Sequence, residues 1–202
     1  MFLKKLTVSN TPQSLAYQDL LFEEIEIFKA RGRTREAIGP CQSLLNTRIQ
    51  QTDEEAKQRS RTQLGECREA LGNHKGALIV REAVLENAKR QKPGEALLPA
   101  VLDVAKSRTK LGDYEKAYEL LKGAPQTIVG LRKVHHRDDI MLIKKRLGNV
   151  CQRTGRFEEA IQNREEVLHT LNQRCYPRDH AEVLDAKTNL AHSYLELSLI
   201  HI

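Results

Sequence analysis

The chain has 202 residues, of which 30% are charged and 4% aromatic, with no Trp and 11 Gly. This composition is typical of helical proteins rich in Leu, Ala, Glu and Lys, and it argues against a β-sandwich or a barrel. Lys and Arg outnumber Asp and Glu by 33 to 27, a formal charge of +6, but the charges are interspersed along the chain. Interspersed charge favours a solvated helix surface over a block that binds nucleic acid.

The chain opens on residues 1–14, which we expect to be an N-terminal extension. Its first six residues include two Lys but are not followed by an apolar stretch, so a signal peptide is not predicted. An organelle-targeting role for the first 18 residues, which contain no acidic residue, is the alternative. No apolar stretch approaches the ~20 residues of a membrane-spanning helix. The four cysteines are far apart in sequence and form no C-x-x-C pair, which favours a reducing compartment and gives no support to a zinc site or disulfide framework. We therefore expect a cytoplasmic protein, with organelle or cytoskeletal association as an alternative.

A short motif, in which Gly is followed five positions later by Ala (G-x-x-x-x-A), recurs along the chain. It occupies 32–37, 72–77, 112–117 and 155–160, so its glycines are 40, 40 and 43 residues apart. A further small residue precedes each of the last three glycines by seven positions, as Gly65, Ala105 and Gly148. We expect the glycine to end one helix with a positive φ, and the alanine to pack in the first turn of the next helix against the small residue. Asn73 and Asp113, directly after their glycines, are suited to cap the second helix.

Apolar spacing predicts helices on both sides of each turn. First helices are expected near 15–30, 54–71, 96–111 and 139–154, and second helices near 35–50, 75–90, 114–122 and 157–173. Breaks are expected at 92–94, 123–125 and 176–177, each of which contains Pro.

These elements predict an all-α fold, an α-solenoid of antiparallel helix pairs with about 4.5 repeats. The repeat domain is expected to span 15–196, with repeats near 15–50, 53–91, 95–134, 138–174 and a partial one at 180–196. Residues 197–202 read Leu-Ser-Leu-Ile-His-Ile, which a common sequencing adapter also encodes, so we expect a non-native tail on a protein that continues in nature.

These helix pairs, with their recurring Gly and Ala, resemble the tetratricopeptide repeats (TPR). The common form repeats every ~34 residues, and the longer period here is similar to the repeats of kinesin light chains. Residues 176–183 and 188–194 resemble that variant's G-x-D-H-P-x-V and N-L-A-x-x-Y phrases, although Tyr176 replaces Gly and Ala181 replaces Pro. The family's aromatic before the turn is present as Phe28 and Tyr194 but absent at 68, 108 and 151. The repeat-defining positions are Gly65, Gly72, Ala77, Ala105, Gly112, Ala117, Gly148, Gly155, Ala160 and Ala191.

The resemblance implies that first helices line a concave groove for a peptide or partner protein. The groove positions carried over are Lys106, Lys110, Lys145, Arg146, Asn149, Arg153, Asn189 and His192. Their Lys and Arg side chains would suit an extended acidic peptide, and Asn side chains can bond its backbone. Solubilising surface charge is the alternative interpretation.

No catalytic, cofactor or metal motif occurs in the sequence. We interpret His135–His136 as an exposed pair, Asp138–Asp139 as a helix N-terminal cap and Cys175 as an unactivated loop thiol. We expect a non-enzymatic adaptor that needs no cofactor. The alternatives are a regulatory region of a larger enzyme and a helical-repeat nucleic-acid binder, which the lack of regular groove aromatics disfavours. The sequence determines neither the partner nor the oligomeric state.

Overall fold

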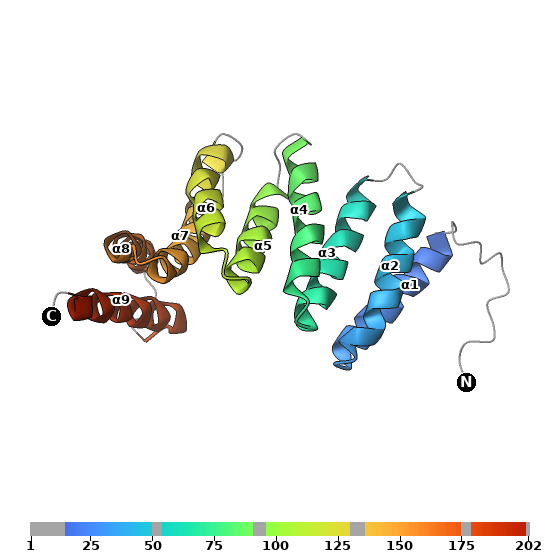
Figure 1. Cartoon of the computed structure of the whole chain (residues 1–202), viewed down its shortest axis with the longest axis horizontal. Helices are drawn as coiled ribbons and strands as arrows, with labels where there is room; N and C mark the ends of the chain where they lie inside the picture. The colour runs from blue at the N-terminus through green and yellow to red at the C-terminus, as the bar shows by residue number, and fades with distance from the viewer. Residues whose placement is uncertain (1–14, 50–53, 91–95, 130–135, 175–178, 201–202) are drawn as a thin grey trace. The chain divides into compact units, whose positions relative to one another are not determined.

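The computed structural model describes residues 15–49, 54–90, 96–129, 136–174 and 179–200 (Figure 1). These residues form nine α-helices and no strand, which confirms the all-α prediction. The helices are α1 (Leu15–Ala30), α2 (Thr34–Ile49), α3 (Glu54–Ala70), α4 (His74–Arg90), α5 (Leu97–Lys110), α6 (Tyr114–Val129), α7 (His136–Arg153), α8 (Phe157–Gln173) and α9 (Ala181–Ile200). They make four helix pairs and a ninth helix.

The chain divides into two compact units, Met1–Asn87 and Ala88–Ile202. The first unit holds α1, α2, α3 and most of α4. Its core is one buried cluster drawn from all four helices, made of Leu21, Ile25, Ala37, Cys41, Leu44, Leu64, Cys67 and Val80. Because every helix of this unit contributes to the cluster, the two helix pairs share one apolar interior.

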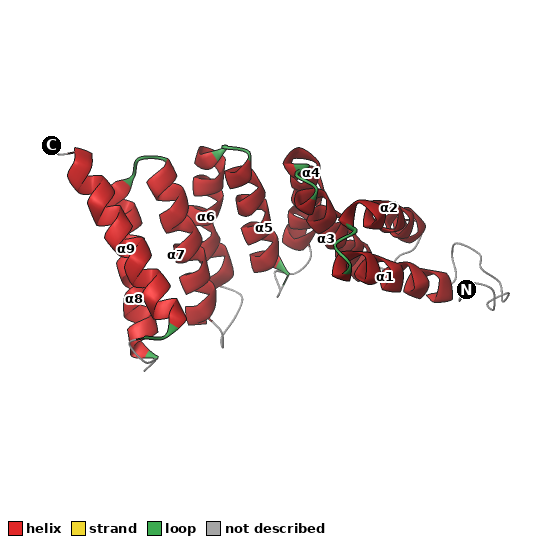
Figure 2. Ribbon diagram, turned by 90° about the horizontal axis from the view of Figure 1, so that it is seen from below, coloured by secondary structure: helices red, strands yellow, loops and turns green. Residues whose placement is uncertain are grey.

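The second unit is a row of antiparallel helices, α5 to α9 (Figure 2). Val104 of α5, Leu121 of α6 and Ile143 of α7 are fully buried along it. A further cluster joins α8 to α9 through Val167, Leu171, Val183 and Ala186. Each helix therefore buries one face against its neighbours in the row.

The four predicted turn glycines have the backbone that the sequence predicts. Their φ angles are +69° at Gly32, +74° at Gly72, +78° at Gly112 and +74° at Gly155. The four alanines that follow, at 37, 77, 117 and 160, are 0% exposed. Asn73 caps α4, since its Oδ1 accepts a hydrogen bond of 2.9 Å from the backbone N–H of Gly76. The side chain of Asp113 instead pairs with Lys116 at 3.1 Å.

The small residues before the turns make room for one large side chain from the paired helix. A Cβ built on Gly65 would lie 3.4 Å from Cγ of Arg81 and 4.0 Å from the carbonyl oxygen of Ala77. A Cβ on Gly148 would lie 3.2 Å from Cγ of Arg164 and 3.6 Å from the carbonyl oxygen of Ala160. Helix approach at these positions is thus as close as the sequence predicts.

Two helix boundaries and the burial of one small residue differ from the prediction. The expected break at 123–125 is wrong, because α6 continues through Pro125 to Val129. Proline removes one backbone hydrogen bond, and burial of Leu121 and Ala124 holds the helix together around it. Helix α7 begins at His136, before the expected Asp139. Ala191 is exposed, unlike the other small positions, because no helix follows α9 among the described residues. The expected breaks at 92–94 and 176–177, and residues 1–14, lie outside the described residues.

Candidate functional site

The first helices of the second unit place polar side chains on a common face. On α7, Lys145, Arg146, Asn149 and Arg153 recur at spacings of one, three and four residues, which keeps them on one side of the helix. Asn189 and His192 do the same on α9, and Lys106 and Lys110 on α5. The three helices alternate with α6 and α8 along the row, so these side chains approach one another from α5, α7 and α9.

Three adjoining pockets run along α7, and the groove they form is called the α7 groove below. One pocket of about 260 Å³ has α7 and α9 as walls and includes Lys145, Arg146, Asn149 and Asn189 in its lining. Another, of about 270 Å³, lies between α5 and α7 and includes Lys106 and Lys110. The third, larger and more open, includes Arg153 and His192. All eight predicted positions thus line the groove, and Asn149 lines all three pockets.

The deepest polar residue of the groove is Arg164, a side chain that the sequence reasoning missed. It comes from α8 and is 6% exposed. Its Nη1 donates to the carbonyl oxygen of Asn189 at 2.7 Å and to the hydroxyl of Ser193 on α9. Its Nη2 donates to Oδ1 of Asn149 at 3.1 Å and to Oε1 of Gln152 on α7. One guanidinium therefore joins α7, α8 and α9 at the bottom of the groove.

All four direct partners of Arg164 are neutral oxygens. Burial lowers the pKa of Arg164 from its usual value, and the charge of Glu196 opposes this shift. Arginine nevertheless stays protonated in proteins. The groove is therefore backed by a buried positive charge that no carboxylate contacts directly among the described residues.

Arg81 provides a comparison within the same chain, because it occupies the matching position of the second repeat. Arg81 and Arg164 each follow their glycine by 16 residues. The residue one helical turn after the glycine is Glu69 in one repeat and Gln152 in the other. Arg81 consequently makes an ion pair with Glu69, at 2.5 Å, whereas Arg164 bonds an amide. The distinguishing signal, Glu against Gln at this position, is readable in the sequence once the register is known.

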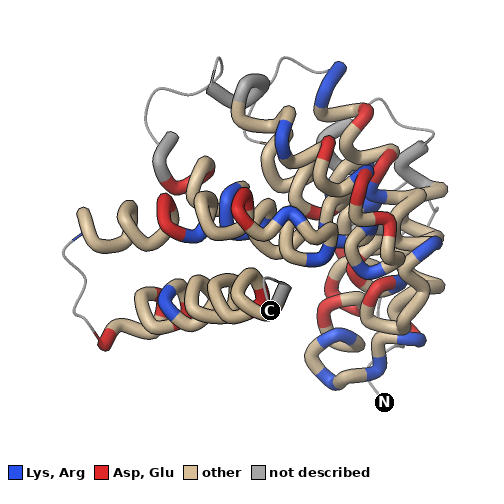
Figure 3. The backbone as a smooth tube through the Cα atoms, turned by 60° about the vertical axis from the view of Figure 1, so that its left-hand side comes forward, with Lys and Arg blue, Asp and Glu red and all other residues tan. Residues whose placement is uncertain are grey.

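Acidic side chains from α9 enter the same groove. Glu182 pairs with Lys145 at 3.4 Å. Glu196 accepts a hydrogen bond of 2.6 Å from Gln152 and lies 3.4 Å from Nδ1 of His192. Arg146 and Arg153 are exposed and have no ion pair or side-chain hydrogen bond within the described residues. The groove is thus of mixed charge, and among the described residues Arg146 and Arg153 are unpaired cations on α7. Lys and Arg are likewise interspersed with Asp and Glu along the helices (Figure 3).

Among the residues that the structure describes, the others singled out in the sequence add no second site. Asp138 and Asp139 lie in the first turn of α7, where carboxylates complement the helix dipole, and Asp138 also pairs with Arg174. No group of three potential ligands for a metal ion occurs in the described part of the chain. No described helix combines the length and apolar character needed to cross a membrane. His135, Cys175 and the side chain of His136 lie outside what the structure describes.

Comparison with known proteins shows what the fold is similar to. No protein-family model matches the chain, and no curated protein matches it in sequence. Among solved structures, it is similar to a Podospora anserina protein of nearly identical TPR-like repeats assigned to the kinesin light chains, with a TM-score of 0.73 and 18% identity over 94% of this chain and 90% of that one. BtubC (BKLC) from P. vanneervenii gives 0.74 at 14% identity over 91% and 74%. Apo RapI gives 0.78 at 11% identity over 90% and 64%.

These similarities define the class of the fold. The chain has the helical-repeat fold of TPR-like proteins, an α-solenoid class, as its Gly and Ala phrases predict. The long-period, kinesin light chain-like form of the repeat is among its structural neighbours.

Proposed function

We propose that the chain is a non-catalytic protein-binding scaffold whose α7 groove takes an extended peptide segment with acidic side chains. The observation that carries this proposal is Arg164, a buried cation whose direct partners among the described residues are all neutral. Arg146 and Arg153, on the wall in front of it, have no ion pair within the same residues. Positive charge in a partly desolvated groove favours carboxylates, and Arg can bind them with two parallel hydrogen bonds.

The asparagines of the groove suit a peptide backbone. Asn149 uses its Oδ1 to accept from Arg164, which leaves its NH₂ group to donate to a carbonyl oxygen of the ligand. Asn189 is exposed and also lines two of the pockets. A segment lying along α7 would thus receive backbone hydrogen bonds from amides and side-chain contacts from arginines.

The mixed charge of the groove favours a peptide over a nucleic acid as its ligand. Glu182, Asp185 and Glu196 line the same pockets, and their carboxylates would repel the closely spaced phosphates of a nucleic acid. A peptide can match such a pattern with separate acidic and basic side chains. NprR, another structural neighbour at a TM-score of 0.69, is described as a quorum sensor, so a fold similar to this one occurs in a sensor protein. A regulatory region of a larger enzyme would use the same groove in the same way.

We place this scaffold in the cytoplasm. Cys41, Cys67 and Cys151 are free and buried. Cysteines that remain free are usual where the compartment keeps thiols reduced.

The test uses three fluorescein-labelled peptides of equal length, in which Ser alternates with Glu, Gln or Lys, and measures binding to the full chain by fluorescence anisotropy. We expect the Glu peptide to bind best and to weaken as salt rises, because exposed charges are screened. Arg146→Glu/Arg153→Glu is expected to weaken it at least ~10-fold, the equivalent of 1.4 kcal/mol. The matched control is Arg31→Glu/Arg35→Glu, the same charge change at exposed residues of the first unit.

Equal loss in both double variants would show that only net charge matters and would remove the groove from the proposal. Equal binding of the Glu and Gln peptides, still lost in the groove variant, would keep the groove and remove the acidic preference. Circular dichroism confirms equal helicity of the variants before binding is compared.

A further inference from the structure

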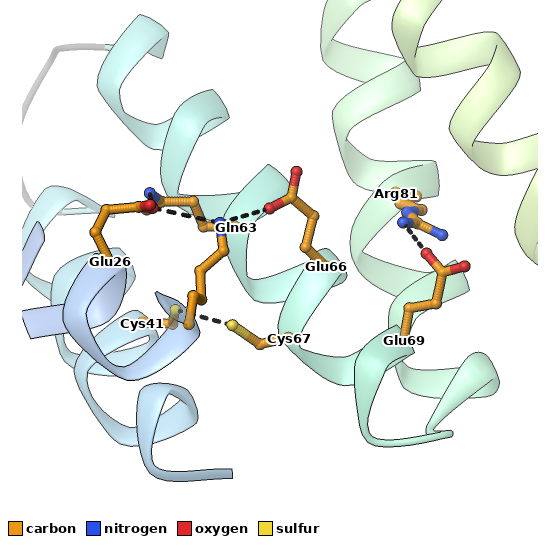
Figure 4. A network of polar contacts seen from close by, with 8 residues as sticks. Glu26, Cys41, Gln63, Glu66, Cys67, Glu69 and Arg81 are labelled. Atoms are coloured by element: carbon orange, nitrogen blue, oxygen red, sulfur yellow. Dashed lines mark hydrogen bonds and ion pairs between the residues drawn. The ribbon is translucent and has the colours of Figure 1, made fainter. Parts of the chain in front are cut away.

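Two cysteines that lie far apart in the sequence meet inside the first unit. Cys41 on α2 and Cys67 on α3 are 0% and 1% exposed, and their Sγ atoms are 3.9 Å apart. Figure 4 shows the two thiols facing one another between the helices. This pairing could not be predicted from the sequence, because the two positions are 26 residues apart and lie on different helices.

A polar cover separates the two thiols from solvent. Lys29 Nζ bonds Glu66 at 3.0 Å and Glu26 at 3.3 Å, and Gln63 donates to Glu26 at 3.2 Å. Figure 4 shows Glu26, Gln63 and Glu66 together on one side of the cysteine pair. Glu26 and Glu66 are exposed, whereas Lys29 and Gln63 are half-buried. Side chains at the surface can part to admit a small molecule more readily than a bulky one. A small oxidant is therefore the reagent that this arrangement admits.

We propose that Cys41 and Cys67 form a reversible disulfide when the folded protein meets hydrogen peroxide, and so cross-link the first helix pair to the second. One thiol loses its proton and its sulfur attacks a peroxide oxygen; the O–O bond breaks, giving a sulfenic acid and, after proton uptake, one water. The sulfur of the other cysteine then attacks the sulfenic sulfur, the S–O bond breaks, and a second water leaves. Two thiols are oxidised by two electrons and one peroxide is reduced to two waters.

The geometry needs only a local adjustment. A disulfide bond is ~2.05 Å long, so the sulfur atoms must approach by about 2 Å from their 3.9 Å separation. The bond would hold α2 against α3 and fix the angle between the two helix pairs of this unit. Closing a loop of this length also restricts the unfolded chain, which raises stability.

Burial makes this reaction slow. It raises the pKa of the Cys41 thiol to about 12, and the pKa of Cys67 is raised as well. Little thiolate is present at neutral pH, so we expect the rate to rise roughly tenfold per pH unit between pH 7 and 9, since the thiolate is the attacking species. The pair would thus respond to sustained oxidation rather than to a brief pulse.

The experiment uses the full chain with Cys175→Ser, which leaves the three buried cysteines. The folded protein is treated with hydrogen peroxide, quenched, blocked with N-ethylmaleimide and digested for mass spectrometry. The expected product is one cross-linked peptide joining positions 41 and 67, reversed by dithiothreitol, with an unfolding temperature several degrees above that of the reduced protein. Cys41→Ala and Cys67→Ala must each abolish both effects.

The proposal is overturned if peroxide leaves both thiols free, if it carries them to sulfinic acid without a cross-link, or if the cross-link forms only in urea. Cys151 serves as the internal comparison, because it is equally buried but contacts no second thiol among the described residues. A cross-link between Cys151 and either member of the pair would likewise show that the bond forms in an unfolded chain.

Discussion

At the scale of single residues, side chains at matching positions of the two helices in each repeat are complementary in size. Gly65 and Gly148 lie against Arg81 and Arg164. At the same two register positions the third repeat has Ala105 and Leu121, and the first has Ile25 and Cys41, all buried. The larger the residue on the first helix, the smaller its counterpart on the second, which is what constant close packing between paired helices requires.

This matching predicts different outcomes for two similar substitutions. In a helix interior, alanine is more favourable than glycine by up to ~1 kcal/mol. Gly65→Ala would place its Cβ in ordinary contact with Arg81, so we expect a neutral to stabilising effect of up to ~1 kcal/mol. Gly148→Ala would bring its Cβ to 3.2 Å from Cγ of Arg164, whose tip is fixed by four hydrogen bonds, so we expect a loss of ~1 kcal/mol or more. Urea unfolding followed by circular dichroism measures both, and equal effects would contradict this account.

The thiol of Cys151 provides a prediction from its pKa. Burial raises the pKa of Cys151 from 9.0 to about 12. At pH 8 this leaves roughly a thousandth of the thiolate of an ordinary cysteine, and access is restricted as well. Iodoacetamide should therefore alkylate Cys151 at least ~10³-fold more slowly in the folded protein than in urea. Peptide mass spectrometry over time gives both rates, and similar rates would show that the site opens readily.

At the scale of the helices, the turns and most helix ends followed from the sequence, whereas the end of α6 and the start of α7 did not. Glycine at a positive φ has a local cause, so four turns followed from spacing alone. The continuation of α6 through Pro125 depends on burial of Leu121 and Ala124 by other helices. Arg164 was missed for the same reason, because its partners come from α7 and α9. The groove positions themselves came from the family resemblance, and binding by them stays a prediction.

The proline in α6 predicts a gain in stability on its removal. Pro125 offers no N–H to the helix, and its ring crowds the carbonyl group one turn earlier, at a cost of up to ~3 kcal/mol. We expect Pro125→Ala to raise the free energy of unfolding by ~1–3 kcal/mol. Glu119→Ala, at an exposed residue of the same helix, controls for a general gain in helix propensity. An unchanged or lower stability would indicate that the proline ring is needed for packing at this position.

The cap of α4 predicts a loss of stability when Asn73 is replaced. Asn73→Ala removes the acceptor for the N–H of Gly76 and should cost ~1 kcal/mol. Asn73→Asp keeps an acceptor at this place and should change stability by only a few tenths of a kcal/mol. Thermal unfolding of the three proteins distinguishes a lost cap from a general effect of substitution, since in the second case Asp and Ala would cost the same.

At the scale of the whole molecule, the division into two units predicts that the groove does not need the N-terminal helices. All residues of the α7 groove, and Arg164 behind them, belong to the unit from Ala88 onward. In repeat proteins each repeat contacts chiefly its neighbours, so stability is built up locally. We expect a fragment of residues 91–202, which lacks α1 to α4, to remain helical, to unfold cooperatively, and to bind the Glu peptide within ~3-fold of the full chain, less than 1 kcal/mol. Circular dichroism and anisotropy measure these properties, with Arg164→Met in the fragment as a control that must lose binding. A fragment that is folded but does not bind would mean that residues before 91 complete the site, and an unfolded fragment would mean that the two units depend on one another for stability.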